Sequence, residues 1–475
     1  MLPHGVNSAD EDMDGVGPHV ATETCDVADF IHSQAWMLRV TGDGRYADRL
    51  ERAFFNAAPG AVNRTFLGHV YFQAPNLAPG NAASHPGNGK FDEAYFHTPP
   101  CCTGNQARIV PEFVHHTWWG SADDGGLVLT SFAPTRVSAT VTTTAVGGDG
   151  GFPPTAEGGG GAGAAAAATT TARVMLDVET AYPFSGGVNI TLLTVAAAGT
   201  DTDTDTDTDT GTGTGTGAID FPLRLRSPGW LAEGEHLTAT LGGAPVQLVP
   251  AEQEGFLRLR LPAAGWRIGE VLALQLPMSV QAETRETFSN GWTAADANSS
   301  AGYCKNETAM EVLRAHRSRK HDHHNHRHHH HEHDNDHLHG HHDDDHHGDA
   351  TQDEAGDRGV LKAGHCLVTP GLPYCEVSRG PLLFALPLEQ SADFGFALRC
   401  DASTMAVSRQ AALPSPFDWP LAAPLALTAK AAPFNWTDAW ALPAGPVDAL
   451  PSRDVELVPY GCAKRLHISM FPLLK

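Results

Sequence analysis

The chain has 475 residues and a formal net charge of −24 at pH 7, although much of that charge lies in low-complexity tracts. This charge argues against nucleic acid or an anionic membrane as a partner. No apolar run approaches the roughly 18 residues that a membrane-spanning helix needs. The length is sufficient for two or three domains, each with a core of its own.

The first part of the chain reads as helical. Residues 22–57 predict two helices joined by a tight turn, because apolar residues recur near the helical period on both sides of the Thr41–Gly44 break. A third helix is expected over residues 105–118, with Pro111 near its first turn or kinking it. This order of elements indicates an αα-hairpin region.

After Trp119 the pattern changes to short, alternating segments bounded by Gly or Pro, such as "GLVLTSFAPTRVSATV", "VNITLLTV", "FLRLRLPAAGW" and, from Arg379, "RGPLLFALPLE". These segments are typical of antiparallel strands in a β-sandwich. Helices first and strands later predict an α+β multidomain chain.

Three low-complexity tracts interrupt the strands and are expected to be disordered insertions, because they cannot bury enough apolar surface to offset their ordering entropy. They are a Gly/Ala tract (145–171), a Thr/Asp/Gly repeat (198–217) and a His/Asp-rich tract within 286–360. The predicted units are therefore a helical part (1–119), a β-sandwich (120–285), the His/Asp-rich insertion (286–360) and further β-strands (361–475). The imidazoles of the third insertion either chelate Zn, Ni or Cu loosely or form a linker without a role.

The sequence does not decide the cellular compartment of the protein. The start shows no basic segment followed by an apolar one, so no secretory signal is visible. Five Asn-X-Ser/Thr sequons weakly favour the secretory route. Eight cysteines in 475 residues are too sparse for a disulfide scaffold.

One set of cysteines indicates a metal site. Glu23 and Cys25 head the first predicted helix, and Cys101 and Cys102 follow two prolines. Three thiols and one carboxylate are a plausible set of zinc ligands, whereas the competing interpretation is buried free cysteines. Pro99-Pro100 and Gly104 favour a rigid exposed loop for the cysteine pair.

Four separated blocks carry a resemblance to a known family. "ETCDVADFIHSQAWMLRVTGDGRYADRLERAFFNA", "HVYFQAPN", "PPCCTGNQAR" and "RGPLLFAL" occur in the order found in glycoside hydrolase family 127, the β-L-arabinofuranosidases and their relatives. The resemblance implies a zinc-dependent, retaining glycosidase with a cysteine nucleophile. It also implies an (α/α)6 barrel followed by β-sandwiches, and a carbohydrate substrate.

The resemblance also assigns roles to residues. Glu23, Cys25, Cys101 and Cys102 fall at the zinc ligands, and Cys101 falls at the nucleophile. Tyr71 falls at an active-site tyrosine near the sugar. Glu11 is the best match by type for the acid/base within "HGVNSADEDMDG", a run that reads otherwise as a solvated terminus.

The front half of the implied barrel has no counterpart. An (α/α)6 ring needs about 12 helices, hence well over 200 residues, whereas about three helices precede the strands. The chain is therefore expected to be the C-terminal part of an enzyme, with apolar helix faces left uncovered. The alternatives are a zinc-stabilised fold without a sugar role, or a non-catalytic carbohydrate-binding or structural remnant. In the remnant, Trp119, Trp230 or Trp266 could stack on sugars, although tryptophans at strand ends are more often core residues.

Overall fold

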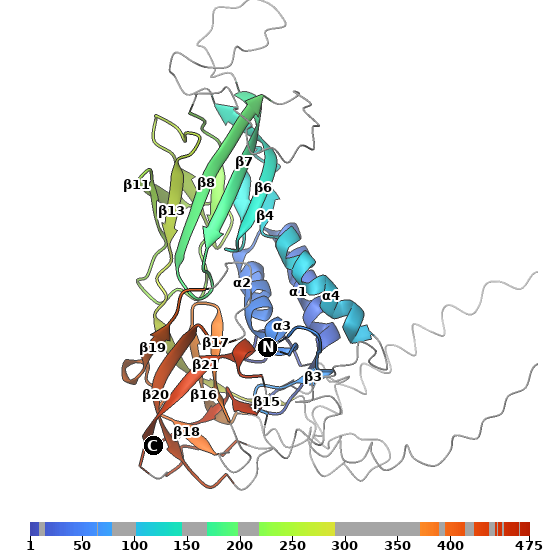
Figure 1. The fold of residues 1–475 in the computed structure, drawn as a ribbon, viewed down its shortest axis with the longest axis vertical. Coiled ribbons are helices and arrows are strands. Elements are labelled where there is room, and N and C mark those ends of the chain that lie inside the picture. Colours follow the sequence, from blue (N-terminus) through green and yellow to red (C-terminus); the bar gives the residue numbers. More distant parts are fainter. Residues whose placement is uncertain are drawn as a thin grey trace, which may run out of the picture.

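A computed structural model describes residues 1–8, 15–63, 65–77, 101–144, 169–197, 218–289, 371–388, 395–413, 422–436, 442–443, 445–448, 451–464 and 466–475. Glu11, nearly all of the three low-complexity tracts and the two prolines before Cys101 lie outside these residues. Within them, the helices lie beside two large β-sheets that are stacked along the long axis of the molecule (Figure 1).

The two helices expected over residues 22–57 are present. They are α1 (Thr24–Thr41) and α2 (Gly44–Arg52), which runs on through a π-helical segment (Ala53–Ala57) into the short α3 (Ala58–Gly60). Gly42 ends α1 in the left-handed region at φ 69°, and its N–H donates to the carbonyl oxygen of Leu38. The Asp43 carboxylate then accepts from the N–H of Arg45 and caps α2.

The third helix differs from its prediction. Helix α4 spans Cys101–His115, so the paired cysteines form its first turn and do not lie in a loop. Cys102 is fully buried and Cys101 is exposed. Pro111 lies inside the helix on an exposed position. The carbonyl that loses its hydrogen bond there faces away from the core, which makes the proline tolerable.

The first large sheet has ten strands in the order β4-β5-β9-β12-β11-β10-β13-β8-β7-β6. All neighbouring pairs are antiparallel except β5 and β9, which are parallel. The two edge strands of this sheet come close to each other: the indole of Trp118 in β4 donates to the Thr135 hydroxyl in β6, 3.1 Å away. The strands are β4 (Trp118–Gly120), β5 (Leu127–Leu129), β6 (Thr135–Thr144), β7 (Thr169–Thr180), β8 (Gly187–Ala197), β9 (Leu223–Arg226), β10 (Thr238–Leu241), β11 (Ala244–Pro250), β12 (Phe256–Arg260) and β13 (Val271–Gln275).

The second large sheet follows the order β14-β16-β17-β21-β20-β18, with β19, β22 and β23 at its sides. Its strands are β14 (Val280–Glu286), β16 (Pro373–Arg379), β17 (Leu382–Pro387), β18 (Phe396–Leu398), β19 (Ala406–Gln410), β20 (Leu425–Pro433), β21 (Arg453–Pro459), β22 (His467–Ile468) and β23 (Phe471–Pro472). A disulfide between Cys375 and Cys400 joins β16 to the segment after β18. Two small ribbons pair β1 (Gly15–Val16) with β15 (Phe288–Ser289) and β2 (Thr22–Glu23) with β3 (Phe72–Gln73).

Two edges of the expected insertions are ordered. Strand β7 begins at Thr169, inside the tract expected over 145–171, because its β-branched threonines pair with those of β6. Strand β14 runs to Glu286 and β15 covers Phe288–Ser289, inside the start of the tract expected over 286–360.

One hydrophobic cluster joins the helices to both sheets. It contains Ile31 of α1, Phe113 of α4, Leu225 of β9 and Phe384 of β17. A buried ionic network reinforces the contact between α2 and β9. The Arg226 guanidinium lies 2.5 Å from the Glu51 carboxylate, and both side chains are fully buried.

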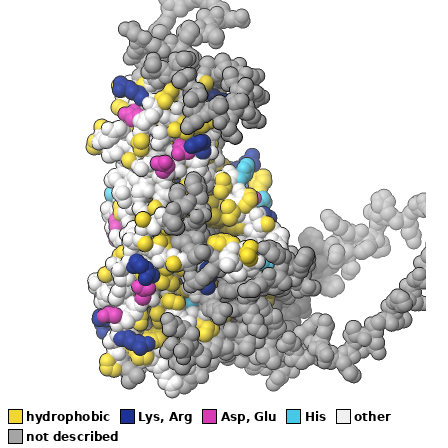
Figure 2. Space-filling view, viewed as in Figure 1, with side chains coloured by type: hydrophobic (Ala, Val, Ile, Leu, Met, Phe, Trp, Pro, Cys, Tyr) yellow, Lys and Arg dark blue, Asp and Glu magenta, His cyan; other side chains and the backbone are white. Residues whose placement is uncertain are grey.

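The helices in the described ranges form no closed ring, so the barrel implied by the resemblance is not itself visible. Their outer faces carry exposed apolar side chains, namely Trp36, Met37 and Val40 on α1 and Val110 and Val114 on α4. Figure 2 shows hydrophobic side chains gathered over this side of the molecule. None of the helices in the described ranges is both long and apolar enough to span a membrane.

Candidate metal centre

Two helix starts and one strand end bring four ligand residues together. Glu23 ends β2 and is the N-cap residue of α1, and Cys25 lies in the first turn of α1. Cys101 and Cys102 are the first two residues of α4. The residue numbers of the paired side chains rise together in α1 and α4, since Asp29 pairs with Arg108 and His32 with Glu112. Helices α1 and α4 are therefore parallel, and both begin at the same end.

The ligand atoms of Glu23, Cys25, Cys101 and Cys102 all lie within 4.8 Å of one another. The Cys25 and Cys102 sulfurs are 3.4 Å apart, and the Cys101 and Cys102 sulfurs are 4.0 Å apart. The Glu23 carboxylate oxygen Oε1 lies 3.4 Å from the Cys102 sulfur and 3.5 Å from the Cys101 sulfur.

These separations fit a tetrahedral ion. Zinc–sulfur bonds of about 2.3 Å place neighbouring sulfurs about 3.8 Å apart at the corners of a tetrahedron, and a carboxylate oxygen slightly closer. The donor set agrees with the geometry, because thiolates with one carboxylate suit zinc better than hard cations such as Mg²⁺.

Electrostatics also favour a cation at this place. Burial raises the pKa of the Cys25 thiol to about 12, and a hydrogen bond to Glu23 adds to the rise. Burial likewise raises the pKa of Cys102, with the neighbouring Cys25 and Glu23 adding to it. Without a cation these two sulfurs therefore stay protonated. The amino ends of α1 and α4 both point their positive partial charge at the cluster, which favours thiolates.

The wall beside the cluster comes from the segment before β3. Tyr71 and Phe72 pack edge to face, 4.4 Å between ring centroids, and share a small buried cluster with Ala21 and Cys102. The carbonyl oxygen of Tyr71 accepts from the N–H of Thr24, which fixes this segment on the start of α1. His69 reaches the Thr103 hydroxyl of α4 at 3.0 Å. Tyr71 is thus held next to the sulfur atoms.

The structure brings together the four candidate ligands and Tyr71, whereas Glu11 lies outside the described residues. Of the three tryptophans that could stack on sugars or belong to the core, Trp266 is fully buried and packs on Phe221, so it is a core residue. Trp119 and Trp230 are half-buried, and their indoles donate to the His116 carbonyl oxygen and to Glu51.

Sequence reasoning assigned no role to Asn105, Arg108, His69 or Thr103, which surround the cluster. Asn105 and Arg108 stand within "PPCCTGNQAR", three to seven residues after the cysteines. Helical spacing from Cys101 and Cys102 was the only pattern that pointed to them. It becomes informative only once α4 is known to begin at Cys101.

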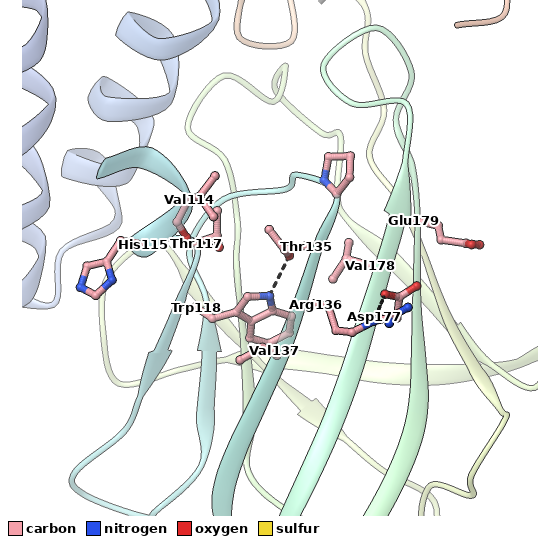
Figure 3. A pocket seen from close by; sticks show the side chains of 11 residues that line it. Val114, His115, Thr117, Trp118, Thr135, Arg136, Val137, Asp177, Val178 and Glu179 are labelled. Atoms are coloured by element: carbon pink, nitrogen blue, oxygen red, sulfur yellow. Dashed lines mark hydrogen bonds and ion pairs between the residues drawn. The ribbon is translucent and has the colours of Figure 1, made fainter. Parts of the chain in front are cut away.

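A cavity of about 700 Å³ lies at the other end of α4, between the helix end and strands β6 and β7. Its lining includes Trp118, Arg136 and Asp177 (Figure 3), and Arg136 Nε pairs with the Asp177 carboxylate at 2.8 Å. The 15 residues of α4 separate this cavity from the cysteines by about 20 Å, so it is not part of the cluster.

Two family models match parts of the chain. Residues 10–115 match the family described as "Beta-L-arabinofuranosidase, GH127 catalytic domain" and residues 163–278 match its "GH127 middle domain". No curated protein sequence is detectably similar to the chain.

Solved structures share the fold. A GH127 β-L-arabinofuranosidase from Geobacillus stearothermophilus T6 is 16% identical with a TM-score of 0.54, covering 100% of this chain and 54% of its own. A structure named "Glycoside hydrolase" is 16% identical with a TM-score of 0.53, covering 97% of this chain and 54% of its own. A GH127 β-arabinofuranosidase is 13% identical with a TM-score of 0.51, and the match covers 99% of this chain and 53% of its own. The chain spans about half the length of these proteins.

Helices that bring three thiols and a carboxylate together pack against large sheets in a mixed α+β fold, which these solved structures share. Both matches fall in sequence order on the helical part and on the first large sheet. Residues 10–115 and 163–278 belong to the catalytic-domain and middle-domain families of glycoside hydrolase family 127.

Proposed function

We propose that the chain is the part of a retaining glycosidase that carries its cation centre, and that the substrate is a β-L-arabinofuranoside or a related sugar. The observation that supports this most is the cluster of three sulfurs and one carboxylate, built on the residues that match the family's catalytic domain. A structural neighbour named as a β-L-arabinofuranosidase supports the choice of sugar.

Zinc is the cation that we propose, with Glu23, Cys25, Cys101 and Cys102 as its ligands. When bound, the ion would keep the sulfurs deprotonated, which makes a thiolate available near neutral pH. Cys101 is the exposed member of the set, while Cys102 is buried and Cys25 half-buried. Cys101 is therefore the sulfur that a sugar can reach.

In the reaction that we propose, the Cys101 sulfur attacks the anomeric carbon and forms a carbon–sulfur bond as the glycosidic carbon–oxygen bond breaks. A carboxylic acid donates its proton to the leaving oxygen. The same group, now a carboxylate, then takes a proton from the water that releases the sugar from Cys101, which retains the anomeric configuration. Glu11 is our candidate for this acid/base, and Tyr71 is our candidate for contacting the sugar.

A domain organisation is part of the same proposal. We propose that residues 1–119 are the C-terminal part of an (α/α)6 catalytic barrel and that residues 120–285 form a β-sandwich. Residues 361–475 would then complete the C-terminal β-region, with 286–360 inserted between the two.

Replacing the nucleophile tests the proposal. We expect the parent chain to hydrolyse an aryl β-L-arabinofuranoside. Cys101→Ser should lower kcat by about a thousandfold or more, because a hydroxyl is a far weaker nucleophile than a thiolate. Cys462→Ser, the same change at a buried cysteine distant in sequence, is the matched control. Equal hydrolysis by Cys101→Ser and the parent would show that the mechanism is wrong. Sugar binding without turnover, unaffected at Cys101, would instead favour a carbohydrate-binding remnant.

A further inference from the structure

Three polar contacts tie α1 to α4 at intervals of one helical turn. The Asn105 side chain hydrogen-bonds to the Cys25 sulfur. One turn further, the Arg108 guanidinium pairs with Asp29. One turn beyond that, Glu112 lies 2.7 Å from His32 Nδ1. We call these contacts the α1–α4 ladder. Its first rung includes a sulfur of the candidate cation centre, and its other rungs do not.

Asn105 lies on the same face of α4 as the paired cysteines, because it follows Cys101 by four residues and Cys102 by three. Arg108 Nε donates to the Asn105 oxygen Oδ1 at 2.7 Å. Since a guanidinium has no acceptor, the amide oxygen must face Arg108, and the NH₂ group is left for the sulfur. Asp29 in turn holds Arg108. Arg108 and Asp29 therefore fix the orientation of the Asn105 amide.

The charge of the filled centre explains why such a donor matters. Three thiolates and one carboxylate carry four negative charges, so a divalent cation leaves two of them uncompensated. An N–H donor to a thiolate and a guanidinium behind it offset part of this excess. Groups that orient metal ligands through hydrogen bonds typically change metal affinity 10- to 100-fold when they are mutated.

We propose that Asn105 is a positioning residue, which orients the Cys25 sulfur toward the cation, and that Arg108 and Asp29 fix the amide of Asn105 in that orientation. This inference rests on the proposed cation centre and goes beyond it by assigning the residues that set its affinity. It predicts that Asn105 and Arg108 control cation binding without being ligands.

Cobalt(II) is the probe, because its thiolate charge-transfer absorption reports sulfur ligands and is not produced by the imidazoles of the His/Asp-rich tract. The full chain would be titrated with Co²⁺ and then competed with Zn²⁺. Asn105→Asp keeps the size of the side chain and its contact with Arg108, but turns the donor into an acceptor beside the sulfur. We expect it to shift the absorption band and weaken cation binding by about 10- to 100-fold.

Arg108→Ala leaves Asn105 in place but free to rotate, so we expect a smaller loss of affinity in the same direction. Glu112→Gln is the matched control, because it alters the far rung of the α1–α4 ladder, about 10 Å further along α4. It should leave the band and the affinity unchanged. Circular dichroism would establish that each variant is folded, and Arg108→Ala decides the matter if Asn105→Asp does not fold.

The two proposals fail in different ways. A parent chain that shows no thiolate–cobalt band has no cation centre, and the proposed function fails with it. A parent chain that shows the band, together with folded Asn105→Asp and Arg108→Ala variants of parental affinity and spectrum, overturns the positioning role alone. An equal loss in Glu112→Gln would also overturn it, since helix packing in general would then be responsible.

Discussion

Adjacent cysteines in the first turn of a helix take different environments, because successive helical residues point about 100° apart. Cys102 turns inward, where it is fully buried beside Cys25 and Tyr71, while Cys101 stays exposed at the helix start. Two neighbouring thiols can thus serve one centre in different ways. In the proposed centre the inner sulfur would be a buried ligand, and the outer one would be the sulfur that a substrate can reach.

At this scale we predict the effect of removing the Tyr71 hydroxyl. In Tyr71→Phe the ring keeps its packing on Phe72, so the free energy of unfolding should change by no more than about 1 kcal/mol. If the hydroxyl contacts the sugar, kcat/KM should fall about tenfold. Steady-state kinetics together with thermal unfolding separate the two effects. Unchanged kinetics would remove Tyr71 from the sugar site.

At the scale of elements, the contact between α2 and the first large sheet depends on buried charge. Arg226 pairs with Glu51 and Asp48 of α2 and donates to the Thr130 carbonyl oxygen at 2.5 Å. Glu51 also accepts a hydrogen bond of 2.6 Å from the Tyr182 hydroxyl. The ion pair with Arg226 and the hydrogen bond from Tyr182 stabilise a carboxylate that is fully buried.

We therefore expect Arg226→Ala to lower the free energy of unfolding by about 3–5 kcal/mol, because it leaves the Glu51 carboxylate buried without its cation. Arg136→Ala is the control, since its pair with Asp177 is solvent-exposed on the Arg136 side and should contribute about 1 kcal/mol or less. Denaturant titrations of both variants measure the difference. Similar losses in the two would contradict a special role for the buried network.

The α1–α4 pair should weaken in acid. Burial lowers the pKa of His116 below its usual 6.5, although Glu112 opposes the shift. Burial works to raise the pKa of Glu112, but hydrogen bonds from His32 and His116 lower it on balance below its usual 4.5. Because the unfolded chain takes up these protons first, stability is lost as pH falls below 6.5 and again below 4.5.

The measurement is thermal unfolding as a function of pH. The midpoint should fall as the pH is lowered from about 7 to about 5, and His116→Gln should flatten this part of the curve, leaving the loss near pH 4. His115 and His32 also act on the charge of His116, and both are present in the parent and in the variant. A curve with the same slope in parent and variant would show that His116 does not contribute.

At the scale of the whole molecule, the helices and both large sheets share one hydrophobic cluster. Ile31, Phe113, Leu225 and Phe384 belong to it although they come from four different elements. Elements that bury their apolar faces against one another lose those contacts together. The described part of the chain is in this respect one packed body.

We predict that the chain unfolds in a single transition. Far-ultraviolet circular dichroism and tryptophan fluorescence should give the same denaturant midpoint, because helices and sheets share that core. Removing the cation with a chelator should lower the common midpoint, since the ligands tie together the starts of α1 and α4. Two separate midpoints would show that the helices and the sheets are independent units.

Local patterns were sufficient for much of the fold. The helix pair within 22–57, the break at Gly42 and most strands after Trp119 follow from periodicity and turn residues, which act over a few neighbours. The start of α4 was predicted wrongly, because two prolines and a glycine near the cysteines resemble a loop when burial is unknown. The sequence left Trp266 open between sugar stacking and the core, since exposure depends on residues distant in sequence, and the structure places it in the core.

The sequence by itself indicated the family and the four candidate ligand residues, because the motif that carries them is a matter of residue type and order. Tertiary structure alone decided that Glu23 and Cys25 lie within reach of Cys101 and Cys102, that Cys101 is the exposed sulfur, and that Asn105 stands behind Cys25. The reason is physical. Distances across 76 residues of chain depend on how α1 packs against α4, and that packing is set by the shared core and the α1–α4 ladder.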